Sequence, residues 1–424
     1  MLKYKNILIT AVISVLVFVM MTIAQDAPVE RSGIGMRSVF AGGRGAAPNG
    51  RGMRGIFGSQ GSGITSPEIT EDKKVTFRIS APNATSVSVS GDWGGQSGAF
   101  GAGGVSVDMT KNDQGLWSVT VGPLESEFYG YTFNIDGAQI WDPANMQLKR
   151  DGTRIESVLI VPGKKGDLYS VKDVPHGTIA KVWYDSPTLK LKRRMYVYTP
   201  PGYETSGEKY PVLYLLHGAG GDEDAWTSLG CTQQIMDNLI AAGKAKPMIV
   251  VMTNGNADQT AAPNVVPAPA TGGIGIFGAR SSTRSGGGIG GGPFPESLAK
   301  DVVPFIEKSY RVLTDKANRA IAGLSMGGAH TISVSTSYPA MFDYIGVMSM
   351  GSDNAEQFDT LRKEDPKLFW VGCGTDDFLY QNALNLVKIL KDKDFNYKYN
   401  ESTGGHTWTN WRIYLSELAP LLFK

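Results

Sequence analysis

The chain has 424 residues, which is long enough for two domains with separate cores. Its formal net charge is +1 and charged residues make up 19% of it, so it lacks the excess of positive charge that attracts nucleic acid. Its four histidines and two cysteines include no His-x-x-x-His or Cys-x-x-Cys pair. This argues against a zinc hydrolase, and we expect neither a metal nor another cofactor.

The N-terminus predicts a secretory signal peptide over residues 1–24. Two lysines precede an apolar run over residues 7–23, which ends at a small-residue cleavage site. We expect cleavage after Ala24, export to the periplasm or beyond, and no stable membrane insertion afterwards. The alternative is an uncleaved membrane anchor, because the apolar run is slightly long. In an exported protein, Cys231 and Cys373 fit either a disulfide or two buried thiols.

A Gly- and Arg-rich segment over residues 25–65 has no apolar period and indicates a flexible linker. Residues 66–163 then alternate polar and apolar side chains in short runs, as in "KKVTFRISAPNATSVSVSGDW", "GLWSVTVGPL" and "YGYTFNIDG". This pattern predicts a small all-β, immunoglobulin-like sandwich with most strand aromatics in its core. Trp93 and Trp141 lie in turn-like segments and are candidates for stacking on sugar rings.

After a second linker at residues 164–177, the pattern changes. Residues 178–424 alternate apolar strands with helical stretches, and several strands run into a loop, as in "PVLYLLHGAGG", "RAIAGLSMGG" and "KLFWVGCGTDD". Buried strands that alternate with helices predict an α/β fold with a mostly parallel, doubly wound sheet. A long Gly/Pro/Ser/Ala insertion at residues 257–293 follows a strand end and is either disordered or a lid.

The candidate nucleophile is Ser325 in "GLSMGG". A bare Gly-x-Ser-x-Gly is a weak signal in a chain with 53 glycines, but here an apolar strand precedes the serine and a helical stretch follows it. Such a strand–turn–helix exposes the hydroxyl on a tight turn, and Gly323 and Gly327 avoid collisions on either side. The prediction that Ser325 is a nucleophile therefore depends on the surrounding strand and helix rather than on the motif alone.

A neutral serine needs a general base, and four histidines are available. His176 lies in the second linker, and His217 directly follows a strand. His330 lies on the helix after the nucleophile, where a surface or packing role is expected. His406 follows the last strand and two glycines, so its position predicts the general base.

The carboxylate that orients the base is expected between the serine and the histidine in chain order. Asp376 and Asp377 both lie at the end of a strand. We favour Asp377 over Asp376 and keep Asp353 as a third candidate, because only measured geometry distinguishes them.

Two backbone N–H groups are expected to form an oxyanion hole. Met326 follows the nucleophile at the start of its helix and supplies one of them. The loop "HGAGG" at residues 217–221 supplies the other, from Ala219 or its neighbour Gly218. The alternative interpretation of this loop is a simple turn.

Four motifs, "YLLHGAGGDEDAW", "GLSMGG", "GCGTDDFLY" and "GGHTWTNWR", together resemble carbohydrate esterase family 1 over about residues 178–424. This α/β-hydrolase group contains feruloyl esterases and acetyl xylan esterases. The resemblance implies that Ser325 is the nucleophile, that His406 is the general base and that Asp377 is the carboxylate that orients this histidine. The insertion departs from the family pattern. In the sandwich, "GDW", "YGYTFNIDG" and "DPAN" resemble carbohydrate-binding module family 48.

The resemblance implies an exported serine esterase that hydrolyses hydroxycinnamoyl (feruloyl) esters on plant cell-wall xylan through an acyl-enzyme. Its substrate partner would be feruloylated arabinoxylan or an oligosaccharide from it. The alternatives are an acetyl xylan esterase, a siderophore esterase and a non-catalytic glycan-binding protein. Trp408, Trp226 and Trp411 either line the substrate site or pack in the core.

Overall fold

The structure is a computed structural model that describes residues 63–94, 104–262 and 291–424. The predicted signal peptide, nearly all of the first linker and most of the insertion at 257–293 lie outside the described residues. Among the helices of the three described ranges, none combines the length and the apolar character that crossing a bilayer requires.

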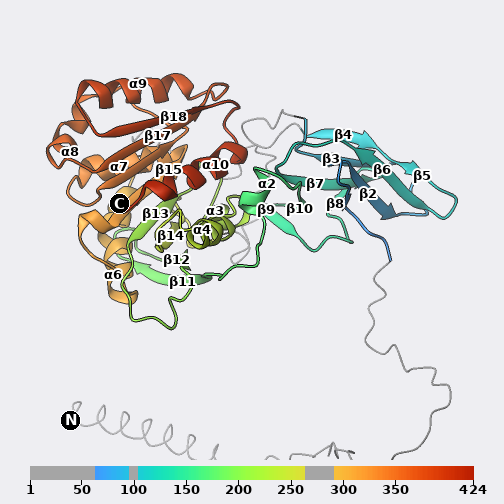
Figure 1. The fold of residues 1–424 in the computed structure, drawn as a ribbon, viewed down its shortest axis with the longest axis horizontal. Coiled ribbons are helices and arrows are strands. Elements are labelled where there is room, and N and C mark those ends of the chain that lie inside the picture. The colour runs from blue at the N-terminus through green and yellow to red at the C-terminus, as the bar shows by residue number, and fades with distance from the viewer. Residues whose placement is uncertain (1–62, 95–103, 263–290) are drawn as a thin grey trace, which may run out of the picture. The chain divides into compact units, whose positions relative to one another are not determined.

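The first domain is a β-sandwich, as the alternating pattern predicted (Figure 1). One sheet has the order β1-β2-β6-β5 and the other β4-β3-β7-β10-β9, with β8 paired to β7. The strands are β1 (Glu68–Ile69), β2 (Val75–Ser80), β3 (Val87–Gly91), β4 (Val105–Asp108), β5 (Thr110–Lys111), β6 (Leu116–Val121), β7 (Phe128–Ile135), β8 (Ala138–Ile140), β9 (Leu148–Asp151) and β10 (Arg154–Ile160).

Aromatic side chains fill the core of the sandwich. Phe77, Tyr131 and Phe133 are buried together, which confirms the prediction that most strand aromatics are core residues. Trp93 is also buried and stacks on Phe77 with ring centroids 5.3 Å apart. The expectation that Trp93 stacks on sugar was therefore wrong, because the turn folds its ring inward. Trp141 is 50% exposed and remains a candidate.

The second domain is built on one sheet of eight strands. These strands are β11 (Thr178–Ser186), β12 (Leu191–Thr199), β13 (Val212–Leu216), β14 (Ile249–Thr253), β15 (Arg319–Leu324), β16 (Tyr344–Met348), β17 (Leu368–Gly374) and β18 (Tyr397–Ser402). Their order is β11-β12-β14-β13-β15-β16-β17-β18, and the six from β14 to β18 run parallel. β12 pairs antiparallel with both β11 and β14, and the other pairs of this sheet are parallel, which confirms a mostly parallel sheet.

Helices cover both faces of this sheet. They are α3 (Ala225–Ser228), α4 (Thr232–Ala241), α5 (Phe294–Ser297), α6 (Val303–Ser309), α7 (Met326–Ser337), α8 (Asp359–Lys363), α9 (Tyr380–Asp392) and α10 (Trp408–Leu418). A π-helical turn η1 (Leu298–Val302) joins α5 to α6, and 3₁₀ turns occur at η2 (Lys316–Asn318), η3 (Glu356–Phe358) and η4 (Ala419–Leu421).

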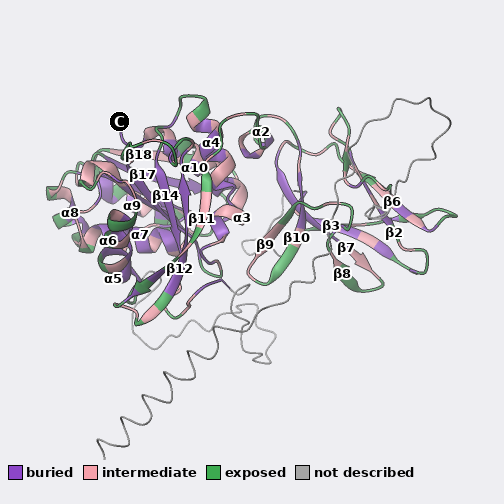
Figure 2. Cartoon of the chain, turned by 90° about the horizontal axis from the view of Figure 1, so that it is seen from below, coloured by how far each residue is buried: buried purple, intermediate pink, exposed green. Residues whose placement is uncertain are grey.

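Alternate side chains of the central strands enter two separate cores. In β13, for example, Tyr214 and Leu216 pack with residues of α5 to α9, while Leu213 and Leu215 pack with residues of α3, α4 and α10. The central strands are therefore buried on both faces, as Figure 2 shows by their purple colour. Burial on both faces explains why these strands read as continuous apolar runs.

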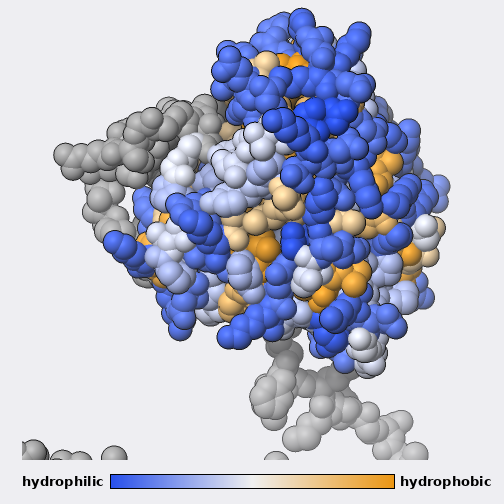
Figure 3. Space-filling view, turned by 90° about the vertical axis from the view of Figure 1, so that its left-hand side faces the viewer, coloured by the Kyte–Doolittle hydropathy of each residue, from blue (hydrophilic) through white to orange (hydrophobic). Residues whose placement is uncertain are grey.

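Two further predictions concern single segments. The second linker contains a short helix, α2 (Gly166–Tyr169), whose residues contact α4, so it is more structured than the sequence indicated. Cys231 and Cys373 are both buried and both free, which selects the alternative of two thiols. On the face drawn in Figure 3, hydrophilic side chains predominate and hydrophobic ones form separate patches.

Candidate active site

Ser325 occupies a strained turn between β15 and α7. Its backbone has φ 52° and ψ −119°, a left-handed conformation that non-glycine residues rarely adopt. Its N–H donates to Met348 O at 2.9 Å, and its own carbonyl accepts from Ala329 N at 3.0 Å, which begins the helix. The turn is thus fixed on both sides, as in a nucleophile elbow.

The glycines around Ser325 are required by close packing of backbone. A Cβ at Gly323 would lie 2.3 Å from Gly327 O, and one at Gly327 would lie 2.5 Å from Leu216 O. Real Cβ atoms do not approach carbonyl oxygens so closely. The collision that the sequence predicted is therefore present, and it involves the neighbouring strand β13 as well as the turn.

His406 and Asp377 form a buried pair. The Nδ1 atom of His406 lies 3.0 Å from both carboxylate oxygens of Asp377. An ionised carboxylate only accepts hydrogen bonds, so Nδ1 must donate. In the neutral ring, Nε2 then has its lone pair free to accept a proton.

The surroundings of Asp377 favour its ionised form. Burial alone would raise the pKa of Asp377, but hydrogen bonds from His406 and from Leu379 N–H outweigh it and hold the pKa below its ordinary value. The Ser349 side chain also contributes to lowering the pKa of Asp377. The sequence analysis missed Ser349; its position directly after β16 is the only signal that pointed to it.

Two aromatic rings flank the imidazole of His406. Trp411 meets it edge-on at 4.9 Å between centroids, and the Nε1 of Trp411 donates to Ser349 Oγ at 2.9 Å. Phe378 packs on it at 4.5 Å, although Phe378 itself is 59% exposed. An exposed phenyl ring next to Asp377 was not singled out from the sequence, where "DDF" resembles any turn.

The loops at the carboxyl ends of β15 to β18 are joined by hydrogen bonds. Ser325 N–H reaches the end of β16 at Met348, and Ser349 N–H reaches β17 at Gly372. Trp411 then connects Ser349 to His406. Ser325 and the His406–Asp377 pair thus lie at the same edge of the sheet, where doubly wound folds place their ligands.

The competing acids lie differently. Asp376 and Asp353 are both exposed, whereas the carboxylate that His406 contacts is that of Asp377. Asp376 instead uses its backbone N–H to bind Gly404 O at 3.1 Å. Of the three candidates, the structure brings only Asp377 to His406.

His217 has both ring nitrogens occupied. Gly255 N–H donates to its Nε2 at 2.7 Å, so Nδ1 carries the proton and donates to Gly218 O at 2.7 Å. Burial lowers the pKa of His217 and keeps the ring neutral. The ring therefore ties the "HGAGG" loop to Gly255, just after β14, a contact that the sequence did not indicate.

His330 is buried against Phe294, with ring centroids 4.7 Å apart, which confirms packing and excludes a surface role. Burial lowers the pKa of His330 to about 3.

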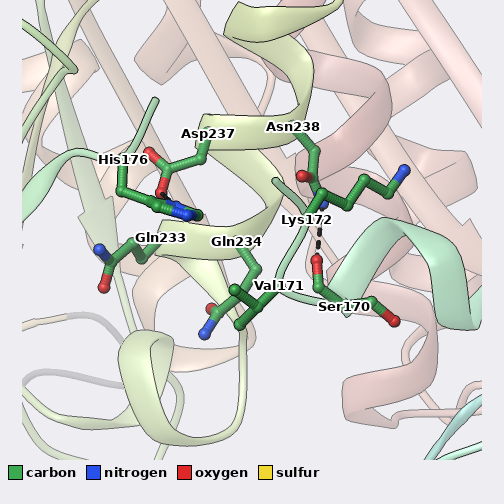
Figure 4. Close-up of a pocket in the computed structure, with 8 residues that line it drawn as sticks. All are labelled: Ser170, Val171, Lys172, His176, Gln233, Gln234, Asp237 and Asn238. Atoms are coloured by element: carbon green, nitrogen blue, oxygen red, sulfur yellow. Dashed lines mark hydrogen bonds and ion pairs between the residues drawn. The ribbon is translucent and has the colours of Figure 1, made fainter. Parts of the chain in front are cut away.

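His176 also pairs with a carboxylate, at 3.0 Å from Asp237, in a hollow beside α4 (Figure 4). Ser170 lines this hollow, but its hydroxyl donates to Gly166 O within α2.

The predicted oxyanion loop lies against Ser325. A Cβ on Gly218 would come within 3.2 Å of the Cβ of Ser325. The Gly218 carbonyl accepts from His217 Nδ1 and from Gly221 N, while Ala219 is exposed. Met326 is the first residue of α7, and N–H groups in a first turn have no partner within the helix.

The three candidate tryptophans form one packed group. Trp226 is fully buried, and its Nε1 donates to Leu216 O at 3.0 Å. Trp408 meets both Trp226 and Trp411 edge-on, each at 5.2 Å. Burial favours packing for Trp226 and Trp411, whereas Trp408 is half-buried.

Fold and site together define an α/β-hydrolase preceded by a β-sandwich. The chain belongs to the family described as putative esterases, which matches residues 186–422. Residues 63–149 match carbohydrate-binding module 48, the isoamylase N-terminal domain. Both resemblances found in the sequence are therefore confirmed.

Two named relatives are similar to this chain over different shares of its length. The chain is 34% identical over 368 residues to an endo-1,4-beta-xylanase/feruloyl esterase of Xylanibacter ruminicola, a match that covers 84% of the chain and 46% of that protein. It is 25% identical to endo-1,4-beta-xylanase Y of Acetivibrio thermocellus, over 58% of the chain and 23% of that protein. The chain thus spans less than half the length of either relative.

Among solved structures, the enterobactin esterase FES from Shigella flexneri aligns with a TM-score of 0.57 at 16% identity. The match covers 82% of this chain and 92% of that chain. At this identity the likeness shows a shared fold alone.

Proposed function

We propose that the chain is an exported serine esterase that hydrolyses feruloyl esters on plant cell-wall xylan. The similarity to the Xylanibacter ruminicola xylanase/feruloyl esterase supports the substrate, since it extends over 84% of the chain. The predicted signal peptide supports export. No cofactor enters the reaction.

Ser325 Oγ attacks the ester carbonyl in this proposal, and His406 Nε2 takes its proton as general base. Asp377 holds the ring through Nδ1 and stabilises the imidazolium that forms. The sugar alcohol leaves with a proton from His406, and a feruloyl group stays on Ser325. Water activated by His406 then releases ferulate and restores the serine.

Negative charge develops on the carbonyl oxygen during both steps. The N–H of Met326 and the N–H of Ala219 or Gly218 stabilise it. The close approach of Gly218 to Ser325 supports this assignment. The exposed ring of Phe378 and the half-buried ring of Trp408 are the aromatic side chains that we expect to meet the feruloyl group.

The observation that carries the proposal is the bifurcated contact of His406 Nδ1 with Asp377, at 3.0 Å to both oxygens. It prepares Nε2 as a base at the same sheet edge at which Ser325 is held in a strained turn. A glycan-binding protein without catalysis has no need of either feature.

The test compares methyl ferulate, an aryl acetate and feruloylated arabinoxylan as substrates of the wild type and of Ser325→Ala. We expect the highest kcat/KM on feruloylated substrates and loss of all turnover in the variant, with unchanged melting temperature. A strong preference for the acetate would favour an acetyl xylan esterase. Retained turnover in the variant would reject Ser325 as nucleophile, and an inactive wild type would reject the proposal altogether.

A further inference from the structure

Arg150 of the sandwich binds the hydrolase domain through three side-chain hydrogen bonds. The two terminal nitrogens of its guanidinium reach the two oxygens of Asp222 at 2.6 and 2.9 Å. Its Nε reaches Asp224 at 3.2 Å, and its backbone N–H donates to Ser228 Oγ at 2.7 Å. Asp222 is 4% exposed, so this is a nearly buried, bidentate ion pair.

The bound segment is continuous with the predicted oxyanion loop. Asp222 directly follows residues 217–221. The β9–β10 turn, which contains Gly152, also approaches this loop, because a Cβ on Gly152 would lie 3.9 Å from Gly220 O. Arg150 also donates to Gly152 O at 2.7 Å. The same side chain therefore binds both the β9–β10 turn and Asp222, the residue after the loop.

The loop is held from the hydrolase side as well. Glu223 forms a buried ion pair with Arg194 of β12 at 2.8 Å, and His217 accepts from Gly255 N–H. These contacts fix the two flanks of the loop. Asp222 lies between these two flanks and is bound by Arg150 from the other domain.

A second ion pair joins the sandwich to the other side of the site. Arg412 lies on α10, the helix that follows His406, and it donates to Glu127 at 3.1 Å. Its guanidinium also stacks over Phe128 at 4.8 Å. Thus Asp222, directly after the oxyanion loop, and α10, the helix after the base, both contact the sandwich through arginine–carboxylate pairs that are largely buried.

We propose that Arg150 is a positioning residue for ester hydrolysis, through which the sandwich fixes the oxyanion loop. The inference rests on the proposed function. Without Arg150, Asp222 would be a nearly buried carboxylate with its main counter-charge removed, which is strongly unfavourable. The loop would move to hydrate it and would carry Gly218 and Ala219 away from Ser325.

The loss should fall on kcat, because the oxyanion donors act on charge that exists only in the transition state. Removing one such donor outright costs about 10²–10³-fold in kcat. A loop that has become mobile keeps its N–H donors but no longer holds them in the correct geometry, so we expect about a ten-fold loss of kcat. A domain that only binds polymeric glycan predicts a different result, namely no change on a small ester.

The test measures kcat and KM of Arg150→Met in the full chain, with an aryl acetate that carries no sugar. We expect kcat to fall about ten-fold while KM and the melting temperature change little. Arg150→Lys should recover part of kcat, because an ammonium restores the charge but not the bidentate geometry. The matched control is Arg78→Met, which removes an arginine–carboxylate pair with Glu68 inside the sandwich.

A double-mutant cycle identifies the partner. If Arg150 acts through Asp222, then Arg150→Met in an Asp222→Asn background should cost much less than in the wild type. Unchanged kcat in Arg150→Met, additive effects, or an equal loss in Arg78→Met would each overturn the inference. If Arg150→Met does not fold, Arg150→Lys and Asp222→Asn are judged by the same kcat criterion. An active wild type beside an unaffected Arg150→Met would reject this inference and leave the proposed esterase intact.

Discussion

The Nδ1 atom of His406 lies 3.0 Å from each oxygen of Asp377, and both side chains are buried. This contact fixes which nitrogen of the ring carries the proton. It also leaves a carboxylate inside the protein whose charge depends on its hydrogen bonds.

Asp377→Asn should lower kcat by about 10⁴-fold, because an amide can either accept from Nδ1–H or donate to an unprotonated Nδ1, and so no longer fixes which ring nitrogen carries the proton. The side chain keeps its shape, so the fold should survive. The measurement is kcat on methyl ferulate, with Asp376→Asn as the matched exposed control. Similar losses in both variants would remove the basis for choosing Asp377.

Ser325→Gly should raise stability while it abolishes turnover. Glycine adopts the φ of 52° at this position without the strain that a Cβ causes, and we expect a gain of about 1 kcal/mol in the free energy of unfolding. Ser325→Ala keeps the Cβ and serves as the control, inactive but not stabilised. Denaturant unfolding of the three proteins measures this, and equal stability of the two variants would show that the turn is not strained.

His330→Leu should make the protein less sensitive to acid. Burial lowers the pKa of His330 to about 3, and its Nδ1 has no partner among the described residues. Below pH 6.5 the unfolded chain therefore binds a proton at His330 that the folded protein does not bind. The free energy of unfolding consequently falls as the pH drops through this range. For one histidine the loss is about 2 kcal/mol between pH 8 and pH 5.

Denaturant unfolding at the two pH values compares the wild type with His330→Leu. The leucine should retain packing on Phe294 and lose less stability on acidification, by about 2 kcal/mol. Parallel pH profiles would mean that His330 is protonated in the folded protein.

Phe378→Ala should change the choice of acyl group. The exposed phenyl ring beside His406 offers a surface for an aromatic acid, and such a contact contributes about 1 kcal/mol. We therefore expect kcat/KM on methyl ferulate to fall several-fold relative to that on an aryl acetate. An equal fall on both substrates would assign Phe378 to the support of His406.

Much of this fold was predictable because burial leaves a clear pattern. Strands buried on both faces, such as β13 with Val212 to Leu216, read as unbroken apolar runs, and each ends in a recognisable loop. The alternating sandwich strands were equally clear. The burial of Trp93 was not predictable, because a turn has no regular period that would indicate which way a side chain points.

The site was predictable as a set of positions and less so as a set of contacts. Ser325 and His406 follow strands of one sheet, so chain order brings them to one edge. The choice between Asp377 and Asp376 was harder to predict, because it depends on which of these two adjacent side chains the turn directs into the protein. Ser349 and Arg150 had no motif, because their roles arise from contacts between segments far apart in the sequence.

The most direct test of the account is to identify the residue that becomes acylated. The full chain is treated with an organophosphate ester that phosphorylates activated serines, and activity and peptide masses are followed together. The account predicts one modified residue, Ser325, with loss of activity in proportion to its modification, and no modification in His406→Ala. Inactivation with the label on another residue, or complete labelling of Ser325 with activity retained, would contradict it.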